Sequence, residues 1–239
     1  MTMKTILTSE LLERTTTDKD GSIPFASVVG IFSRESTGEL TVRVELRGTC
    51  GTEEKAYLLP LEMLDSVNIS LKNIPYEIDE EMLDTLVLCD AVAHALHRAY
   101  GIISYGACSY KRLERKLREK GVEREVAATV IEIVKKKGYI DEDYLARRVC
   151  EICLKKYWGR SRVLRKLRED GYCEDAIESA LEYLDTVNFA EQCADLIEKR
   201  YMEIPEDRYE MQKMLASISR YGYSGSEIRE AIKICNFRK

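Results

Sequence analysis

The chain has 239 residues, of which 45% are hydrophobic and 33% are charged, a composition that excludes a wholly disordered protein. It contains only four prolines and thirteen glycines, which argues against a turn-rich all-β sandwich, and no uncharged stretch approaches the roughly 18 to 20 apolar residues of a membrane span. With a formal net charge of −5, we expect a folded, acidic, soluble protein without a membrane partner.

The net charge hides a strong asymmetry along the sequence. Residues 1–108 contain 9 Lys and Arg against 17 Asp and Glu, which gives −8. Residues 111–168 contain 19 against 9, or +10, and residues 169–239 contain 9 against 16, or −7. The basic segment favours an anionic partner, because a local positive field steers binding even when the total charge is negative. A set of solvated amphipathic helices accounts for the same charges and stays open as an alternative.

The N-terminal segment and the cysteines both predict a cytoplasmic protein. Met1 to Asp20 has only a very short apolar patch, at Ile6 and Leu7, and acidic residues follow from Glu10 onward, unlike a secretory signal. The chain has eight cysteines, and in a protein without such a signal we expect them to be reduced thiols that mostly fill the core.

Strand patterns occupy the first part of the chain. Apolar and polar residues alternate from Leu40 to Leu46, which predicts a half-buried strand, and residues 27–32 and 55–59 predict two more. A small antiparallel sheet within residues 22–70 accounts for these three runs.

The periodicity becomes helical from Asp79 onward. Asp79 is suited to cap the first helix, and Glu80 and Glu81 follow in the first turn, where the helix dipole favours negative charge. We expect all later elements to be helices.

Two pairs of residues have the spacing of metal ligands but lack partners. Cys150 and Cys153 form the only CxxC motif, and no second pair or nearby histidine supplies the other two ligands of a zinc site. His94 and His97 lie three residues apart on a predicted helix, where partly buried or surface histidines are the commoner case. We therefore expect neither a metal nor another cofactor.

An internal repeat is the most informative feature of the sequence. RLERKLREKG at residues 112–121 matches RVLRKLREDG at residues 162–171 at seven of ten positions, fifty residues later. Residues in the segment 141–157 correspond to residues in 185–201 at an offset of 44. A third, weaker copy places Ile218, Gly222, Ile228 and Ile232 in the equivalent positions.

The repeats predict a mainly α protein made of tandem three-helix repeats. Short helices cannot bury an apolar stripe alone, so each repeat should be a compact unit that contacts its neighbours, in an elongated, curved rod behind a small strand-rich region. The expected segments are 1–75 (strand-rich N-terminal extension), 76–108 (N-terminal helical segment), 109–160 (repeat 1), 161–203 (repeat 2) and 204–239 (partial C-terminal repeat 3).

Glycines and apolar stripes indicate how each repeat is built. Gly121 and Gly171 follow the first helix of their repeats, at the C-terminal position where only glycine takes a positive φ without steric cost. The third helix of repeat 1 should bury one apolar face, formed by Leu145, Val149, Ile152 and Cys153.

Two stretches of this sequence carry a family resemblance. GYIDEDYLARRV at residues 138–149 and GRSRVLRKLREDG at residues 159–171 resemble RecX, the bacterial regulator of the RecA recombinase. Asp141, Leu145 and Ala146 match the acidic, apolar and alanine positions of that family's central motif. The resemblance covers roughly residues 84–235, and it implies the fold of the family, which consists of tandem three-helix repeats.

The resemblance implies a non-enzymatic modulator in DNA repair, homologous recombination and the SOS response. Such a protein binds RecA filaments assembled on single-stranded DNA, lies along their helical groove, and reduces strand exchange, ATPase and coprotease activity. The implied partners are the RecA filament and its single-stranded DNA, and we expect a monomer. The sequence itself also favours a non-enzymatic protein, because the chain has no GxxxxGK[ST] loop, no GxGxxG after a strand, no GxSxG and no HExxH.

Basic residues that recur in both copies are the candidate contacts to the filament and its DNA. Arg112, Arg115 and Lys116 correspond to Arg162, Arg165 and Lys166, and we call these six residues the basic ridge. Their spacing predicts one exposed face in each helix, opposite the apolar residues. The full candidate set is Arg112, Arg115, Lys116, Trp158, Arg160, Arg162, Arg165, Lys166 and Arg168.

Two other functions fit the same residues. A direct nucleic-acid-binding module would contact phosphates through the basic ridge and stack a base on Tyr157 or Trp158, whereas a general scaffold would bind an unrelated protein. Packing of Trp158 into the next unit, as a cap on its helix, is the alternative to base stacking. Pure phosphate binding should weaken steeply with salt and ignore RecA, while filament binding should require RecA.

Overall fold

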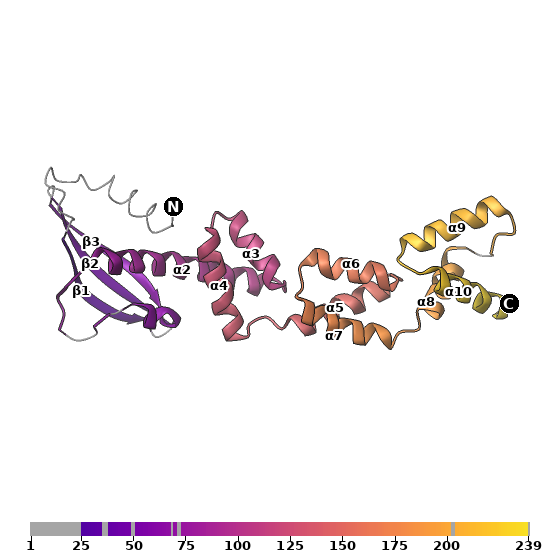
Figure 1. Cartoon of the computed structure of the whole chain (residues 1–239), viewed down its shortest axis with the longest axis horizontal. Helices are drawn as coiled ribbons and strands as arrows, with labels where there is room; N and C mark the ends of the chain where they lie inside the picture. Colours follow the sequence, from indigo (N-terminus) through magenta and orange to yellow (C-terminus); the bar gives the residue numbers. More distant parts are fainter. Residues whose placement is uncertain are drawn as a thin grey trace. The chain divides into compact units, whose positions relative to one another are not determined.

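The computed structural model describes residues 25–34, 38–48, 51–67, 69–70, 73–201 and 204–238, so the segment Met1 to Asp20 lies outside it. In chain order the elements are β1 (Phe25–Arg34), β2 (Glu39–Gly48), β3 (Gly51–Pro60), the 3₁₀ helix η1 (Leu61–Ser66), β4 (Tyr76–Ile78), α2 (Glu80–Tyr105), α3 (Tyr110–Glu119), α4 (Arg124–Lys137), α5 (Glu142–Lys155), α6 (Arg160–Asp170), α7 (Glu174–Asp185), α8 (Phe189–Arg200), α9 (Arg208–Arg220) and α10 (Gly225–Phe237) (Figure 1). They form two compact units, one containing the sheet, most of α2, and α4, and the other containing α5 to α10. The division between the units falls within α3.

The N-terminal unit contains a four-stranded antiparallel sheet in the order β3-β2-β1-β4. Alternate side chains of β2, from Leu40 to Leu46, are buried, while Arg43 and Arg47 between and beyond them are exposed. This alternation confirms the strand predicted from the sequence, and β1 and β3 contain the other two predicted runs. The sequence did not indicate β4, because a strand of three residues has too few positions to show a period.

Helix α2 packs on the sheet and belongs to the same unit. It starts as predicted, with Asp79 Oδ1 accepting a hydrogen bond from the Met82 backbone N–H at 2.8 Å. Asp90 accepts the backbone N–H of Leu58 in β3 at 2.8 Å, and His97 pairs with the buried carboxylate of Glu39 at 2.7 Å. The strand-rich unit therefore extends past the expected boundary at residue 75, which lies one residue before β4.

Helix α2 is long and apolar enough, by length and composition, to span a membrane, although the sequence had led us to expect no such segment. Its apolar residues recur every three or four positions, and Leu86, Cys89, Val92 and Leu96 are buried. That spacing and the polar contacts from Asp90 and His97 to the sheet are those of a core helix.

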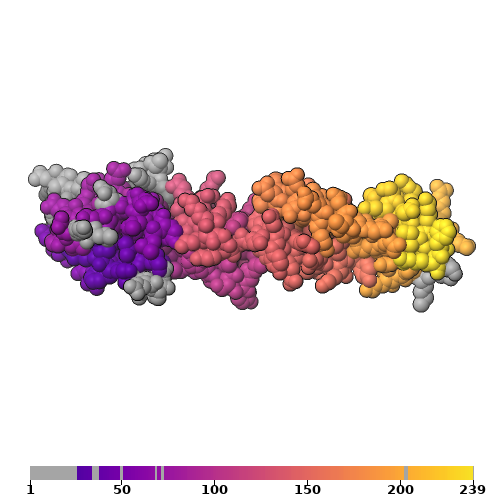
Figure 2. Space-filling view, turned by 90° about the horizontal axis from the view of Figure 1, so that it is seen from below, coloured from indigo at the N-terminus to yellow at the C-terminus, as the bar shows by residue number. Residues whose placement is uncertain are grey.

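From α5 onward the helices group in threes, but each group begins one helix earlier than the expected repeat. Helix α5 packs with α6 and α7, and α10 packs with α8 and α9. In the space-filling view the atoms of α9 and α10, at the yellow end of the colour scale, lie against each other (Figure 2). The division expected between residues 160 and 161 therefore separates α5 from its packing partners. A sequence repeat can be divided at any of its loops, and only the packing shows which three helices form a unit.

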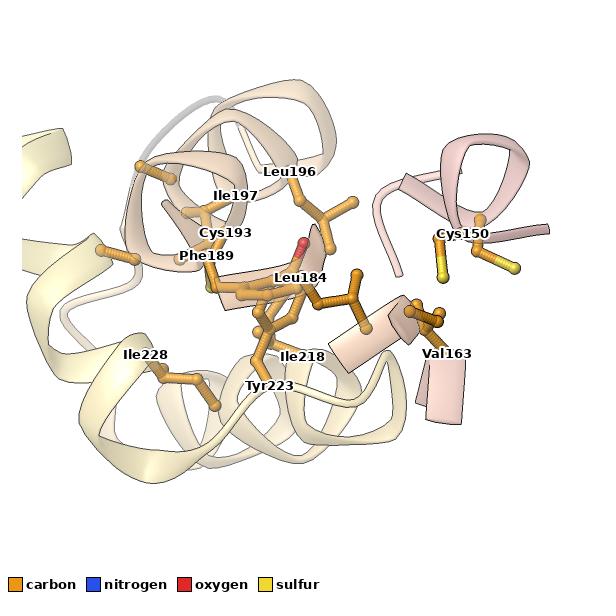
Figure 3. Packing of buried hydrophobic residues seen from close by; sticks show 14 of the residues in the cluster. Cys150, Val163, Leu184, Phe189, Cys193, Leu196, Ile197, Ile218, Tyr223 and Ile228 are labelled. Carbon is orange, nitrogen blue, oxygen red and sulfur yellow. The ribbon is translucent and has the colours of Figure 1, made fainter. Parts of the chain in front are cut away.

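Helices α5 to α10 share one hydrophobic core, and the face that α5 buries in it differs from the predicted face. Figure 3 shows Phe189 and Cys193 of α8 beside Leu184 and Tyr223 in this core. Helix α5 buries Ala146, Cys150 and Cys153 in it, whereas Ile152 is 47% exposed. The expectation that Ile152 lines the core with Cys153 is therefore wrong, because the two residues lie on different sides of α5.

The repeat glycines have the predicted left-handed conformation. The φ angles are +80° at Gly121 and +76° at Gly171, and the third copy repeats the feature at Gly222, with φ +100°. At Gly171 the backbone N–H donates back to Arg168 O, so the residue ends α6 as a C-terminal cap.

A buried carboxylate joins the starts of two helices. Glu142, 6% exposed, accepts the backbone N–H of Tyr110 at 2.6 Å and that of Cys173 at 2.9 Å. These N–H groups lie at the start of α3 and just before α7, where no turn of helix precedes them to supply an acceptor. Nearby, the Ser109 hydroxyl donates to Asp170 O at 2.6 Å.

Replacing Glu142 with alanine should lower the free energy of unfolding by about 2 to 3 kcal/mol, because two partly buried N–H donors lose a charged acceptor. Glu142→Gln is the matched control, since the amide retains one acceptor oxygen and should lose less. Urea denaturation followed by circular dichroism measures both values. Equal stability of wild type and Glu142→Ala would show that water satisfies these donors.

Candidate functional site

The apolar line behind the basic ridge is present as predicted. Leu113 and Leu117 of α3 and Val163 and Leu167 of α6 are fully buried. The basic side chains on the other sides of these helices are not equally exposed. Arg115, Arg165 and Arg168 are exposed, whereas the other five candidates on α3 and α6 are half-buried, namely Arg112, Lys116, Arg160, Arg162 and Lys166. The expectation of one uniformly exposed face is therefore only partly correct.

Arg112 and Arg162 occupy equivalent positions in different surroundings. The backbone N–H of Arg112 donates to Ser109 Oγ at 3.2 Å, and its side-chain Nε is buried without a hydrogen-bond partner. Arg162 instead stacks on aromatic rings. Its guanidinium carbon lies 4.0 Å from the centre of the Trp158 ring and 5.4 Å from that of Tyr221. Both distances fall within the range of cation–π interactions.

The basic side chains around Arg162 have intramolecular carboxylate partners. Lys166 Nζ lies 2.7 Å from Asp170, and Arg165 Nε lies 3.9 Å from Glu169. Arg160 forms an ion pair with Asp185. Such exposed pairs stabilise little, but each places a negative charge where an anionic ligand would approach.

A second arginine completes an alternating arrangement of cations and rings. Arg200, at the end of α8, places its guanidinium carbon 5.2 Å from the Tyr221 ring, on which Arg162 also stacks. Lys156 Nζ lies 5.9 Å from the Trp158 ring. We call Lys156, Trp158, Arg162, Tyr221 and Arg200 the Arg162 column. In the part of the chain that the structure describes, none of its three cations forms an ion pair with a carboxylate.

Close backbone contact between two glycines holds the Arg162 column in place. The Gly159 N–H donates to Tyr221 O at 2.8 Å, and the Ser161 hydroxyl donates to Gly222 O at 2.8 Å. A Cβ on Gly222 would lie 2.5 Å from the Cβ of Arg162, so these two segments of the backbone approach each other at a distance that only glycine allows. The start of α6 is thereby attached to the end of α9, which positions Arg162 beside Tyr221.

The sequence pointed to only part of this surface. It singled out Arg162 and Trp158, but neither Tyr221 nor Arg200 was a candidate. One signal was available, because Lys155-Lys156-Tyr157 and Lys199-Arg200-Tyr201 match in the repeat alignment. That match places a basic residue at the end of both helices, yet it does not reveal that Arg200 and Arg162 meet at one tyrosine.

Trp158 is half-buried against the core, as its packing alternative predicted. Arg162 stacks on its ring, so the indole positions a guanidinium. Tyr157 likewise packs against the core, and its carbonyl oxygen accepts the Tyr223 hydroxyl at 3.0 Å.

The residues considered for metal binding lie in the core or beside carboxylates. Cys150 and Cys153 are buried in the core, and burial raises the pKa of Cys150 to about 11, which keeps its thiol protonated. His97 pairs with Glu39, and His94 lies 3.6 Å from Asp90. Among the residues that the structure describes, no three His, Cys, Asp or Glu side chains are grouped as a metal ion would require.

Curated proteins similar to this chain are named regulatory protein RecX. The protein of Leuconostoc citreum is 28% identical over 154 residues, which cover 62% of this chain and 56% of that protein. The protein of Xanthomonas campestris is 28% identical over 139 residues, which cover 58% of this chain and 85% of that protein. The protein of Clostridium botulinum is 23% identical over 185 residues, which cover 76% of this chain and 85% of that protein. The chain thus spans just over half the length of the Leuconostoc relative. No protein-family model matches the chain.

Solved structures share the fold. A crystal structure of regulatory protein RecX aligns with a TM-score of 0.65 and 20% identity, covering 86% of this chain and 99% of that one. The crystal structure of RecX from Lactobacillus salivarius aligns with a TM-score of 0.54 and 20% identity, covering 62% and 98%. The chain is therefore similar in sequence to several RecX proteins, and it shares the fold of the solved RecX structures.

Proposed function

We propose that this chain is a cytoplasmic regulator of RecA that binds RecA filaments on single-stranded DNA and lowers their strand-exchange, ATPase and coprotease activity. Its relatives are named regulatory proteins, and RecX proteins are regulators rather than enzymes. The partners are the RecA filament and the DNA within it, and the protein acts as a monomer. The strand-rich sheet with α2 forms a separate unit, for which we propose no contact.

The observation that carries the proposal is the unpaired positive charge of the Arg162 column. Two guanidinium groups, of Arg162 and Arg200, lie on one tyrosine ring without a carboxylate partner among the described residues. Like charges held together by packing repel each other, and an anionic ligand relieves that repulsion. Because guanidinium groups bind phosphate through paired N–H donors, the column suits a nucleic-acid backbone.

Exposed arginines of α3 and α6 supply further phosphate contacts in the proposal. Arg115, Arg165 and Arg168 are exposed and would add phosphate contacts, whereas Arg112 is half-buried and its Nε is shielded from solvent. Arg160 and Lys166 would first have to leave Asp185 and Asp170. We therefore place the strongest phosphate contacts at Arg162 and Arg200.

The test of this function is the ATPase activity of RecA on single-stranded DNA, measured with increasing amounts of the protein. We expect the rate of ATP hydrolysis to fall in proportion to the protein bound to the filament. An unchanged rate at saturating binding would contradict the inhibitory role, and absence of binding would contradict RecA regulation altogether.

Direct nucleic-acid binding is the second candidate, favoured by the same unpaired arginines. Binding to bare single-stranded DNA, measured by fluorescence anisotropy from low to high salt, separates the two functions. A nucleic-acid module should bind bare DNA as tightly as the filament at every salt concentration. A filament regulator should bind the filament more tightly, and the difference should grow as salt rises because protein contacts are screened less.

A further inference from the structure

Helix α5 presents partly exposed apolar side chains beside the face that packs into the core. Tyr144 is 58% exposed and Ile152 is 47% exposed, while Leu145 and Val149 between them are half-buried. These four residues lie within one half of the helix surface, and we call them the α5 stripe. Leu145, Val149 and Ile152 are spaced three or four residues apart, and Tyr144 directly precedes Leu145. Large apolar side chains exposed together in this way commonly mark an interaction surface.

The repeat supplies an internal comparison for the α5 stripe. At the offset of 44, Leu145, Val149 and Ile152 correspond to Phe189, Cys193 and Leu196 of α8. Those three residues are 6%, 0% and 3% exposed, and Phe189 packs edge-to-face on Tyr223 at 6.5 Å between ring centres (Figure 3). The same helix face is therefore covered in α8 and partly uncovered in α5.

Unpaired cations border the α5 stripe. Arg148 and Lys155 are exposed, and each lies one helical turn or less along the surface from Tyr144 or Ile152. Neither forms an ion pair within the described part of the chain, whereas Arg147, on the other side, lies 4.0 Å from Glu151 and stacks on Tyr183. The charge around the stripe therefore complements an apolar segment that carries acidic residues.

We propose that the α5 stripe docks the protein component of the filament, through an apolar segment flanked by acidic side chains. This inference rests on the proposed function and assigns the two kinds of contact to different surfaces. The Arg162 column binds phosphates, and its contribution fades with salt. The α5 stripe buries apolar area, and its contribution persists when salt is raised.

The test uses the full chain with Tyr144→Gln and Ile152→Gln combined. Glutamine leaves the net charge unchanged and favours helix, so a loss of binding reports lost apolar contact. Tyr209→Gln is the matched control, because Tyr209 is a 65% exposed aromatic residue on α9, outside the stripe. Affinity is measured for RecA filaments on single-stranded DNA and for the same DNA without RecA, at low and high salt.

We expect the double variant to bind filaments at least about tenfold more weakly at both salt concentrations, and to bind bare DNA as wild type does. The Tyr209→Gln protein should match wild type in every arm. If wild type binds filaments and the double variant binds them equally well, the docking surface lies elsewhere and only this inference is overturned. If wild type does not bind filaments, the proposed function is wrong.

The melting temperature of the free double variant completes the test. An unchanged value is expected, because both side chains are exposed. A clear decrease would show that another part of the same chain covers the stripe, and it would overturn the proposal in favour of an internal contact.

Discussion

Replacing Gly222 with alanine should lower the free energy of unfolding by about 3 kcal/mol or more. The residue has a φ of +100°, which an L-residue adopts at a cost of about 1 to 2 kcal/mol. The new Cβ would also lie 2.5 Å from Arg162 Cβ and 2.6 Å from its backbone nitrogen. Such overlap forces the start of α6 away from α9 and adds about 1 to 3 kcal/mol.

Variants at two other glycines separate the cost of the positive φ from the cost of the Cβ overlap. Gly121 has the same left-handed conformation, but a Cβ at that position would have no other atom within 4 Å, so Gly121→Ala should lose about 1 to 2 kcal/mol. At Gly171 a Cβ would lie 3.0 Å from Lys111 Cβ, which predicts an intermediate loss. Urea unfolding of the three variants measures the series. Equal losses would mean that close packing at Gly222 contributes nothing beyond its φ.

Replacing Arg162 and Arg200 with glutamine should weaken binding to the filament and to bare single-stranded DNA, most strongly at low salt. If each arginine neutralises one phosphate, the plot of log affinity against log salt should become less steep by about 1.4, at about 0.7 for each single-strand contact. Both side chains lie at the surface of the α6–α9 contact, so helicity should stay unchanged. Fluorescence anisotropy gives the slope, and circular dichroism checks the fold.

The control for this variant is Arg165→Gln combined with Lys166→Gln. These ridge residues already interact with Glu169 and Asp170, so their removal should change the slope less. A larger change in the control than in the Arg162 and Arg200 variant would place the phosphate contacts along the basic ridge and away from the column.

Local features of the fold could be predicted because they depend on neighbouring residues. The alternation from Leu40 to Leu46 indicated which face of β2 is buried, and Asp79 marked the start of α2. Gly121 and Gly171 marked left-handed helix ends for the same reason, since conformational preference belongs to the residue itself. The repeated apolar pairs, such as Leu113 with Leu117, likewise indicated the buried side of their helices.

The candidate site could be predicted only in part. The repeat singled out Arg162 by its neighbours in sequence, but the residues that contact it come from other helices as well. Tyr221 reaches Arg162 because Gly159 and Gly222 let two backbones touch, and Arg200 arrives from the end of α8. No local sequence pattern predicts that these residues from different helices contact one another.

Residue patterns alone were enough to define the strand-rich and helical regions, the three-helix repeat, its left-handed glycines and the RecX resemblance. The packing of distant segments was needed to show that α5 packs with α6 and α7, that α2 covers the sheet, and that Ile152 is exposed. Periodicity reports that a helix has an apolar face, but the choice of partner for that face depends on the summed packing of segments distant in sequence. The unpaired charge at Arg162 and Arg200 is a product of that packing.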